Sequence, residues 1–236
     1  MKILSLLLIS CFCGATGQSS LSGAWEHRGG PQNETFQTRI YSGNYFVESE
    51  YDRGGKLFIG TYGGSYLLKE DSISETIEFD SRRPELVGTQ QKKRIKFTKD
   101  GKGYQSGFVF TRVDDGTPGQ LAGAWLITGR INDKGEIRRS TPGARRTMKI
   151  LSGTRFQWIA YNVETKEFLG TGGGAYTTVD GKYTENIAFF SRDNTRVGAA
   201  LGFGYSIEEG DWQHKGLSSK GEPINEIWTK REKIGI

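Results

Sequence analysis

The sequence predicts an all-β protein with two small antiparallel barrels or sandwiches in tandem, after an export signal. Three observations predict this class. The chain of 236 residues contains one internal duplication, and its apolar residues alternate with a period of two rather than 3.6. It also has 34 glycines against only 5 prolines. Many short strands joined by glycine turns have this composition.

The N-terminus has the pattern of an export signal. A positive charge at Lys2 precedes a short apolar run over residues 3–9. Small residues follow at Ala15 and Gly17, the two positions that a signal peptidase reads, so we expect cleavage before Gln18. The sequence therefore predicts a secreted or periplasmic protein.

Both cysteines, Cys11 and Cys13, lie inside this signal. The run from Leu8 to Cys11 also resembles a bacterial lipobox, so a lipoprotein anchored through Cys11 is the alternative, although the apolar run ahead of it is very short. After cleavage the chain has no cysteine, and we expect neither a disulfide nor a thiol nucleophile. No later segment approaches the roughly 20 apolar residues that span a bilayer, so we expect no transmembrane segment.

The charge and the motifs narrow the function classes. The net charge is +5, but the basic clusters are short and no nucleic-acid-binding motif accompanies them, so no nucleic-acid partner is predicted. Two histidines, His27 and His214, are too few for a His-rich metal site. The HExxH, CxxC, Walker and GxSxG motifs are absent. We therefore expect no metal and no cofactor.

Duplication divides the chain into two similar units. The matching runs are "LSGAW" at 21–25 and "LAGAW" at 121–125, "RIYSGNYF" at 39–46 and "KILSGTRF" at 149–156, and "FIGTYGGSY" at 58–66 and "FLGTGGGAY" at 168–176. From residue 39 to residue 88 the offset between the copies stays at 110. The predicted organisation is a signal peptide at 1–17, a first barrel at 18–115, a linker at 116–120 and a second barrel at 121–236.

The clearest hairpin is "AYTTVDGKYTENIAF" at 175–189. Asp180 and Gly181 form a strong two-residue turn, because both tolerate a positive φ. That turn places Tyr176 opposite Glu185, on one face of the hairpin. In the first copy, Glu70-Asp71 takes the turn position, so Tyr66 falls opposite Glu75. The glycines at 172–174 predict a bulge or a sharp bend.

Glu75 and Glu185 each lie in a row of residues that otherwise looks buried. An unpaired carboxylate in an apolar site is unfavourable, so it would raise its pKa or find a cation. One interpretation is an internal hydrogen bond or ion pair, for example from Tyr176, Arg155 or Arg192 to Glu185. The other is a polar anchor at the bottom of a ligand cavity. A catalytic version would use Glu185 with Tyr176 and His214.

Two aromatic strands add further candidates. In "DWQHK" at 211–215, Trp212 and His214 share a face, and a packed neutral histidine is the favoured interpretation over a catalytic one. In "FQWIAY" at 156–161, Trp158 is either a core residue or part of a pocket wall.

The motif Leu-x-Gly-x-Trp on a first strand, with an Arg on the last, resembles the calycin superfamily of lipocalins and fatty-acid-binding proteins. In that superfamily the Trp closes one barrel end and the Arg packs across it. The resemblance implies structural roles for Gly23, Trp25 and Arg112, and for Gly123, Trp125 and Arg231 in the second copy. Lys230 is the alternative to Arg231 as the residue that packs across Trp125.

The second copy also resembles a family of small secreted lipocalin-like proteins from Bacteroidetes-type bacteria, a domain family of unknown function. The resembling run extends from residue 154 to residue 191 and is followed by "IWTK" at 227–230. The resemblance covers most of 121–232, and 21–112 more loosely. It implies a fold but no established chemistry.

Three hypotheses of function follow. The first is a protein that binds a small, partly apolar or glycan-derived ligand, mainly in the second barrel. Its ligand-binding candidates are Trp158, Tyr176, Glu185 and Arg192, with Tyr66 and Glu75 in the first barrel. The second is a cavity enzyme, an isomerase, lyase or hydrolase, that uses a Tyr–Glu acid/base pair. The third is a non-catalytic assembly module of a cell-surface complex. The first two hypotheses require a cavity inside a barrel, whereas the third does not. Side chains can fill a barrel of this size completely, so the presence of a cavity distinguishes them.

Overall fold

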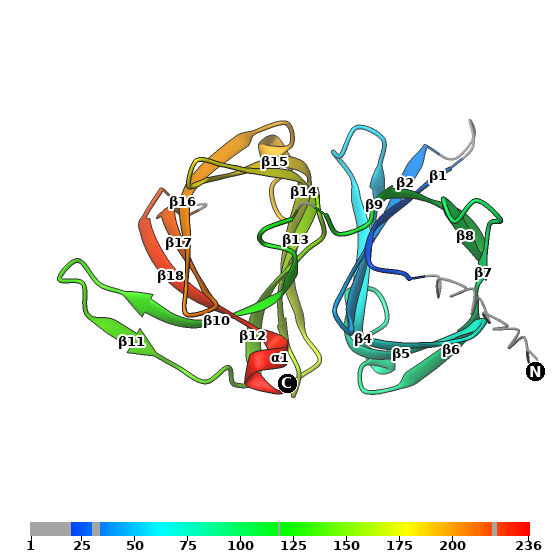
Figure 1. Ribbon diagram of the computed structural model, residues 1–236, viewed down its shortest axis with the longest axis horizontal. Coiled ribbons are helices and arrows are strands. Elements are labelled where there is room, and N and C mark those ends of the chain that lie inside the picture. The colour runs from blue at the N-terminus through cyan, green and yellow to red at the C-terminus, as the bar shows by residue number, and fades with distance from the viewer. Residues whose placement is uncertain (1–19, 30–33, 118, 219–220) are drawn as a thin grey trace, which may run out of the picture.

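The computed structural model describes residues 20–29, 34–117, 119–218 and 221–236. The predicted signal at 1–17, with Cys11, lies outside the described residues. The strands form two antiparallel sheets, each rolled into a barrel (Figure 1). The predicted all-β class, with two barrel-like sheets in tandem, is confirmed.

The first sheet contains β1 (Gly23–Arg28), β2 (Thr35–Ser42), β3 (Tyr45–Asp52), β4 (Phe58–Lys69), β5 (Ser72–Asp80), β6 (Gln90–Arg94), β7 (Lys96–Phe97), β8 (Gly103–Ser106) and β9 (Phe108–Asp114), with the short helix η1 (Pro84–Leu86) after β5. The second contains β10 (Gly123–Ile131), β11 (Ile137–Arg139), β12 (Arg145–Leu151), β13 (Arg155–Asn162), β14 (Phe168–Val179), β15 (Lys182–Phe190), β16 (Ala200–Glu208), β17 (Asp211–Leu217) and β18 (Pro223–Lys230), with η2 (Asn194–Arg196) after β15. Helix α1 (Arg231–Ile234) follows β18.

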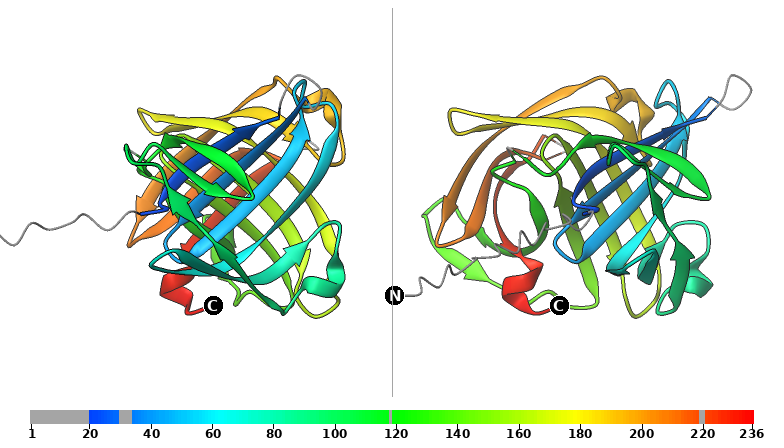
Figure 2. Two further views of the ribbon diagram at one scale, coloured as in Figure 1. Left: turned by 90° about the vertical axis from the view of Figure 1, so that its right-hand side faces the viewer. Right: turned by 45° about the vertical axis from the view of Figure 1, so that its right-hand side comes forward.

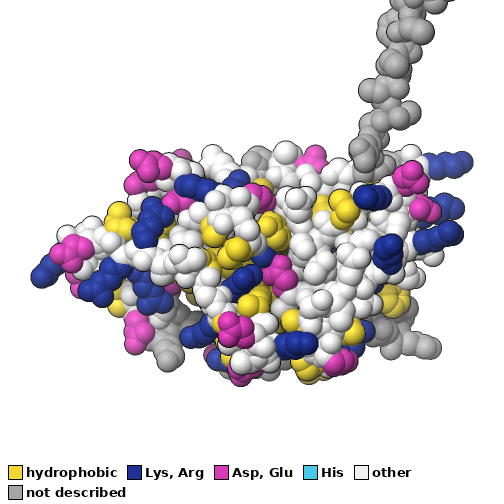
Figure 3. Space-filling view, turned by 90° about the horizontal axis from the view of Figure 1, so that it is seen from below, with side chains coloured by type: hydrophobic (Ala, Val, Ile, Leu, Met, Phe, Trp, Pro, Cys, Tyr) yellow, Lys and Arg dark blue, Asp and Glu magenta, His cyan; other side chains and the backbone are white. Residues whose placement is uncertain are grey.

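The second sheet closes on itself, because β10 pairs with β12 on one side and with β18 on the other. The result is a closed barrel of eight strands, which is compatible with a calycin-like barrel. Strand β11 extends beyond the barrel as an arm, and Lys and Arg side chains gather at this left-hand end of the molecule (Figure 3). The first sheet is nearly closed: its end strands, β6 and β7, are separated along the chain by Ile95 alone.

The predicted hairpin registers are confirmed in both copies. Tyr176 pairs with Glu185 and Tyr66 pairs with Glu75. At the turn of the second hairpin, Asp180 has a φ of 49° and Gly181 a φ of 72°, as a two-residue turn of this type requires. The register therefore sends both glutamates to the interior, where Glu75 and Glu185 are buried.

The predicted bulge in the glycine run is also present. The register between β14 and β15 shifts between Gly173 and Gly174. A Cβ on Gly174 would lie 2.0 Å from the carbonyl oxygen of Asn186, so this position accepts no side chain without a backbone shift. Gly64 occupies the same place in β4. The bulge bends each long strand as a small barrel requires.

The tryptophan of each first strand is buried and makes the same hydrogen bond in both barrels. Trp25 Nε1 donates to the Leu21 carbonyl at 2.8 Å, and the corresponding bond in the second barrel, from Trp125, is 2.9 Å. The Arg112 guanidinium lies 4.1 Å from the centre of the Trp25 ring.

In the second barrel the structure corrects the residue that covers Trp125. Lys230, not Arg231, lies over the Trp125 ring, with its Nζ 5.2 Å from the ring centre. Lys230 is the cross-strand partner of Trp125, as Arg112 is of Trp25. Arg231 is the next residue along the chain, where β18 gives way to α1, and it is buried against the first barrel instead.

The two barrels stand side by side and share a core (Figure 1). Strand β12 packs on β2 and β3. The shared core contains Ile40, Val47 and Phe79 from the first barrel and Ala124, Leu126, Met148, Ile150, Ile159 and Tyr161 from the second. In the turned views of Figure 2 the strands run obliquely, and α1 (red) lies at the lower end of the second barrel.

Candidate ligand-binding site

Glu185 forms an ion pair inside the second barrel. The Lys149 Nζ, from β12, lies 2.7 Å from Glu185 Oε1, and both side chains are almost fully buried. The Tyr183 hydroxyl donates to the same oxygen at 2.9 Å. Burial, together with the neighbouring Glu185 charge, raises the pKa of Tyr183 well above its ordinary value, so this phenol remains a donor. A cation and a hydroxyl thus both contact Oε1 of the buried acid.

Four aromatic rings enclose the Lys149 ammonium. Its Nζ lies between 5.0 and 5.5 Å from the ring centres of Tyr183, Trp212, Trp228 and Phe203. Each such contact is attractive, and more so where water is excluded. The ion pair therefore has one well-defined position in the barrel.

Two further polar side chains lie beside the Lys149–Glu185 pair: His214 on β17 and Glu226 on β18. His214 Nε2 lies 3.4 Å from Lys149 Nζ, and His214 Nδ1 lies 3.5 Å from Glu226 Oε2. Burial and the Lys149 charge lower the pKa of His214 to about 4, so the imidazole is neutral at pH 7. Burial alone would raise the pKa of Glu226, but the nearby imidazole, Lys149 and Arg130 hold it below its ordinary value.

A cavity of about 220 Å³ lies beside these groups. Its polar wall contains Lys149, Glu185, His214 and Glu226, and Arg196 and Thr147 also line it. The remaining wall is mostly apolar and consists of Ile127, Trp158, Ile187, Phe190, Leu201, Phe203, Leu217, Ile224 and Trp228, with Ser218. An apolar cavity with a few converging polar groups is the usual form of a small-molecule site.

The structure brings some of the predicted site residues together and separates others. Trp158 and Glu185 line the cavity, as does His214. Tyr176 is buried beside Tyr183, but its hydroxyl donates to the Ser152 carbonyl at 2.6 Å and not to Glu185. Tyr176 is not among the lining residues, so the geometry brings no Tyr176–Glu185 acid/base pair to the cavity.

Neither arginine considered as a partner of Glu185 reaches it. Arg192 is exposed and lies outside the cavity lining. Arg155 faces the first barrel, where its Nε lies 3.1 Å from Glu26 Oε1. Lys149 is the cation that the sequence interpretation missed.

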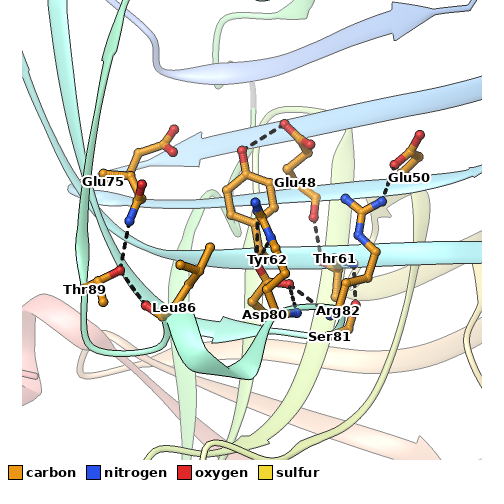
Figure 4. A network of polar contacts seen from close by, with 12 residues as sticks. Glu48, Glu50, Thr61, Tyr62, Glu75, Asp80, Ser81, Arg82, Leu86 and Thr89 are labelled. Atoms are coloured by element: carbon orange, nitrogen blue, oxygen red, sulfur yellow. Dashed lines mark hydrogen bonds and ion pairs between the residues drawn. The ribbon is translucent and has the colours of Figure 1, made fainter.

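The interior of the first barrel is also polar. Lys93 Nζ donates to Glu75 Oε2 at 2.6 Å and to the Tyr62 hydroxyl at 3.1 Å. That hydroxyl donates in turn to Glu48 at 3.2 Å (Figure 4), and Glu48 is paired with Arg39. Glu75 Oε1 has no hydrogen-bond partner among the residues that the structure describes.

The remaining candidate of the first barrel, Tyr66, belongs to the aromatic packing. Its ring lies 4.9 Å from that of Tyr41, in an edge-on arrangement. Burial raises the pKa of Tyr66 to about 12.

The two barrels use equivalent positions but pair them differently. The 110-residue offset relates Arg39 to Lys149 and Glu75 to Glu185. In the second barrel these two positions pair with each other, whereas in the first each has another partner, Glu48 or Lys93. The repeat alignment carried the missed signal, since the matching runs "RIYSGNYF" and "KILSGTRF" both begin with a cation.

A larger cavity, of about 330 Å³, lies between the barrels. Its charged lining residues are Glu26 and Arg155, and these two are paired with each other. Apart from them its wall is uncharged and includes Ile40, Tyr51, Phe156 and Phe189. The concentration of buried titratable groups therefore favours the cavity of the second barrel as the functional site.

Comparisons with known proteins do not assign the chain to a family. No family model matches the chain, and no curated protein matches it significantly. Within the described ranges there is no group of three or more His, Cys, Asp and Glu side chains arranged to hold a metal ion. None of the helices in those ranges is long and apolar enough to cross a membrane.

Proposed function

We propose that this protein binds a small, largely apolar ligand in the cavity of the second barrel, the unit expected at 121–236. The observation that carries the proposal is the cavity itself, which combines apolar walls with Lys149, Glu185, His214 and Glu226. The export signal expected at 1–17 would place this binding outside the cytoplasm. The resemblance to lipocalin-like proteins agrees with a binding role.

The size of the cavity limits the ligand. An apolar cavity of about 150 Å³ holds benzene. The cavity here is about 220 Å³, so it accommodates a molecule somewhat larger than one ring, or a short alkyl chain. Trp158, Phe190 and Leu201 offer apolar contact to such a molecule.

A series of straight-chain alcohols tests the proposal. Calorimetric titration with butanol, hexanol and octanol should show affinity rising about fourfold per added methylene, because burial of each CH₂ contributes about 0.8 kcal/mol. Binding should be lost in Leu201→Trp, which places an indole in the cavity.

The matched control is Leu67→Trp, which adds an indole to an exposed position of the first barrel. It should bind the alcohols like the wild type. Near-ultraviolet circular dichroism would verify that both variants are folded. Equal affinities along the series, or octanol binding that persists in Leu201→Trp, would refute a site in this cavity.

A further inference from the structure

One donor in the wall of the second-barrel cavity lacks a partner. His214 is only 2% exposed, and its Nδ1 has no hydrogen-bond partner among the described residues. Its neighbour Glu226 is the cross-strand partner of His214, yet at 3.5 Å the two groups do not form a hydrogen bond. Both residues line the cavity. A buried polar atom left unpaired is unfavourable, so a ligand that satisfies it gains affinity.

The position of the imidazole proton follows from Lys149. An ammonium group can only donate, and Lys149 Nζ lies 3.4 Å from Nε2 of His214. Nε2 is therefore the acceptor of the neutral ring, and Nδ1 carries the hydrogen. His214, a residue of the cavity lining, thus carries a buried donor without an acceptor.

Glu226 supplies the complementary acceptor. Its Oε2 accepts from Trp228 Nε1 at 3.2 Å, and its nearest cation, Arg130, is 4.0 Å away with a side chain that is 74% exposed. An ionised carboxylate has about four acceptor positions, and these contacts use few of them. Glu226 can therefore accept a further hydrogen bond from a ligand.

The charges on the wall disfavour an anionic ligand. Lys149 is neutralised by Glu185, and Arg196 lies 3.5 Å from Asp193. Glu226 adds a negative charge that is only weakly compensated. A ligand carboxylate would meet this charge in a water-poor space, where like charges repel strongly.

We infer that the cavity selects uncharged ligands with a hydroxyl or carboxamide group over carboxylates. This inference rests on the binding function proposed above. The ligand oxygen accepts from Nδ1 of His214, and the ligand O–H or N–H donates to Glu226. An ammonium group would satisfy Glu226 but leave His214 unpaired. The neutral donor–acceptor group alone fits both.

Four probes with one common chain test this selection: octanamide, octanol, octylamine and octanoate. At pH 7 we expect octanamide to bind at least about tenfold more tightly than octanoate, and octylamine also to bind more tightly than octanoate, because Glu226 attracts its ammonium group. Octanoate binding as tightly as octanamide would overturn the inference. Failure of all four probes to bind would instead overturn the binding function itself.

The variant Glu226→Gln removes the charge and keeps the shape. It should strengthen octanoate binding by about tenfold and bring the affinities of amide and acid together. Glu164→Gln makes the same charge change on the exposed turn between β13 and β14 and should leave the ratio unchanged. If Glu226→Gln leaves the ratio at the wild-type value, the inference fails while the binding function stands.

Discussion

His214 shows how one buried side chain makes the stability of this protein depend on pH. In the unfolded chain a histidine titrates near pH 6.5, whereas burial and Lys149 lower the pKa of His214 in the fold to about 4. The unfolded chain therefore takes up this proton first. The contribution to the free energy of unfolding is complete above about pH 6.5 and is lost as the pH falls towards 4.

The loss between these limits should amount to about 3 kcal/mol for this residue. Urea unfolding at pH 7 and pH 4 measures it, with His214→Gln as the comparison. We expect the wild type to lose about 3 kcal/mol more than the variant over this range. Parallel losses in the two proteins would mean that the pKa of His214 is not lowered in the fold, because the nearby acids Glu226 and Glu185 outweigh burial and the Lys149 charge.

Strand β14 owes its bend to a glycine bulge that the barrel requires. Gly174 has a φ of 157°, and a Cβ added there would collide with the Asn186 carbonyl oxygen. The same arrangement at Gly64 in β4 shows that the bulge belongs to the repeated unit. Glycine is required at these two positions because it has no Cβ, so the carbonyl of the neighbouring strand can approach its backbone closely.

Gly174→Ala should therefore lower the free energy of unfolding by about 2 kcal/mol, since the strand must shift to admit the methyl group. Gly143→Ala is the matched control, because a Cβ at Gly143 meets nothing within 4 Å. It should change stability by less than about 0.5 kcal/mol. Equal effects of the two substitutions in urea unfolding would contradict the steric account.

At the scale of the whole molecule, Glu78 joins the two barrels. It lies on β5 of the first barrel and accepts from Arg231 Nη2 at 2.9 Å and from the Tyr161 hydroxyl at 3.1 Å. The Arg146 Nη1 is 3.8 Å away. Three residues of the second barrel thus converge on one acid of the first.

Glu78→Ala leaves the buried Arg231 without its carboxylate, so stability should fall by about 3 kcal/mol. Glu85→Ala, at an exposed position of η1, should be near neutral. Urea unfolding of both variants measures the difference. A loss below about 0.5 kcal/mol in Glu78→Ala would show that the shared apolar core alone holds the barrels together.

The sequence by itself determined the local architecture. The internal repeat revealed two similar units, and a period of two together with the turn at Asp180-Gly181 placed Tyr176 opposite Glu185. These features depend on neighbours along the chain, where turn geometry and the alternation of side chains set the outcome. They also predicted that both glutamates face inward.

Only the tertiary structure decided which groups meet. Lys149 reaches Glu185 from a strand that does not pair with β15, and His214 meets Lys149 across the barrel. The choice of Lys230 over Arg231 depends on which residue of β18 pairs with Trp125. Such contacts join residues far apart in sequence, and they depend on how the sheet twists and closes, which no local pattern specifies.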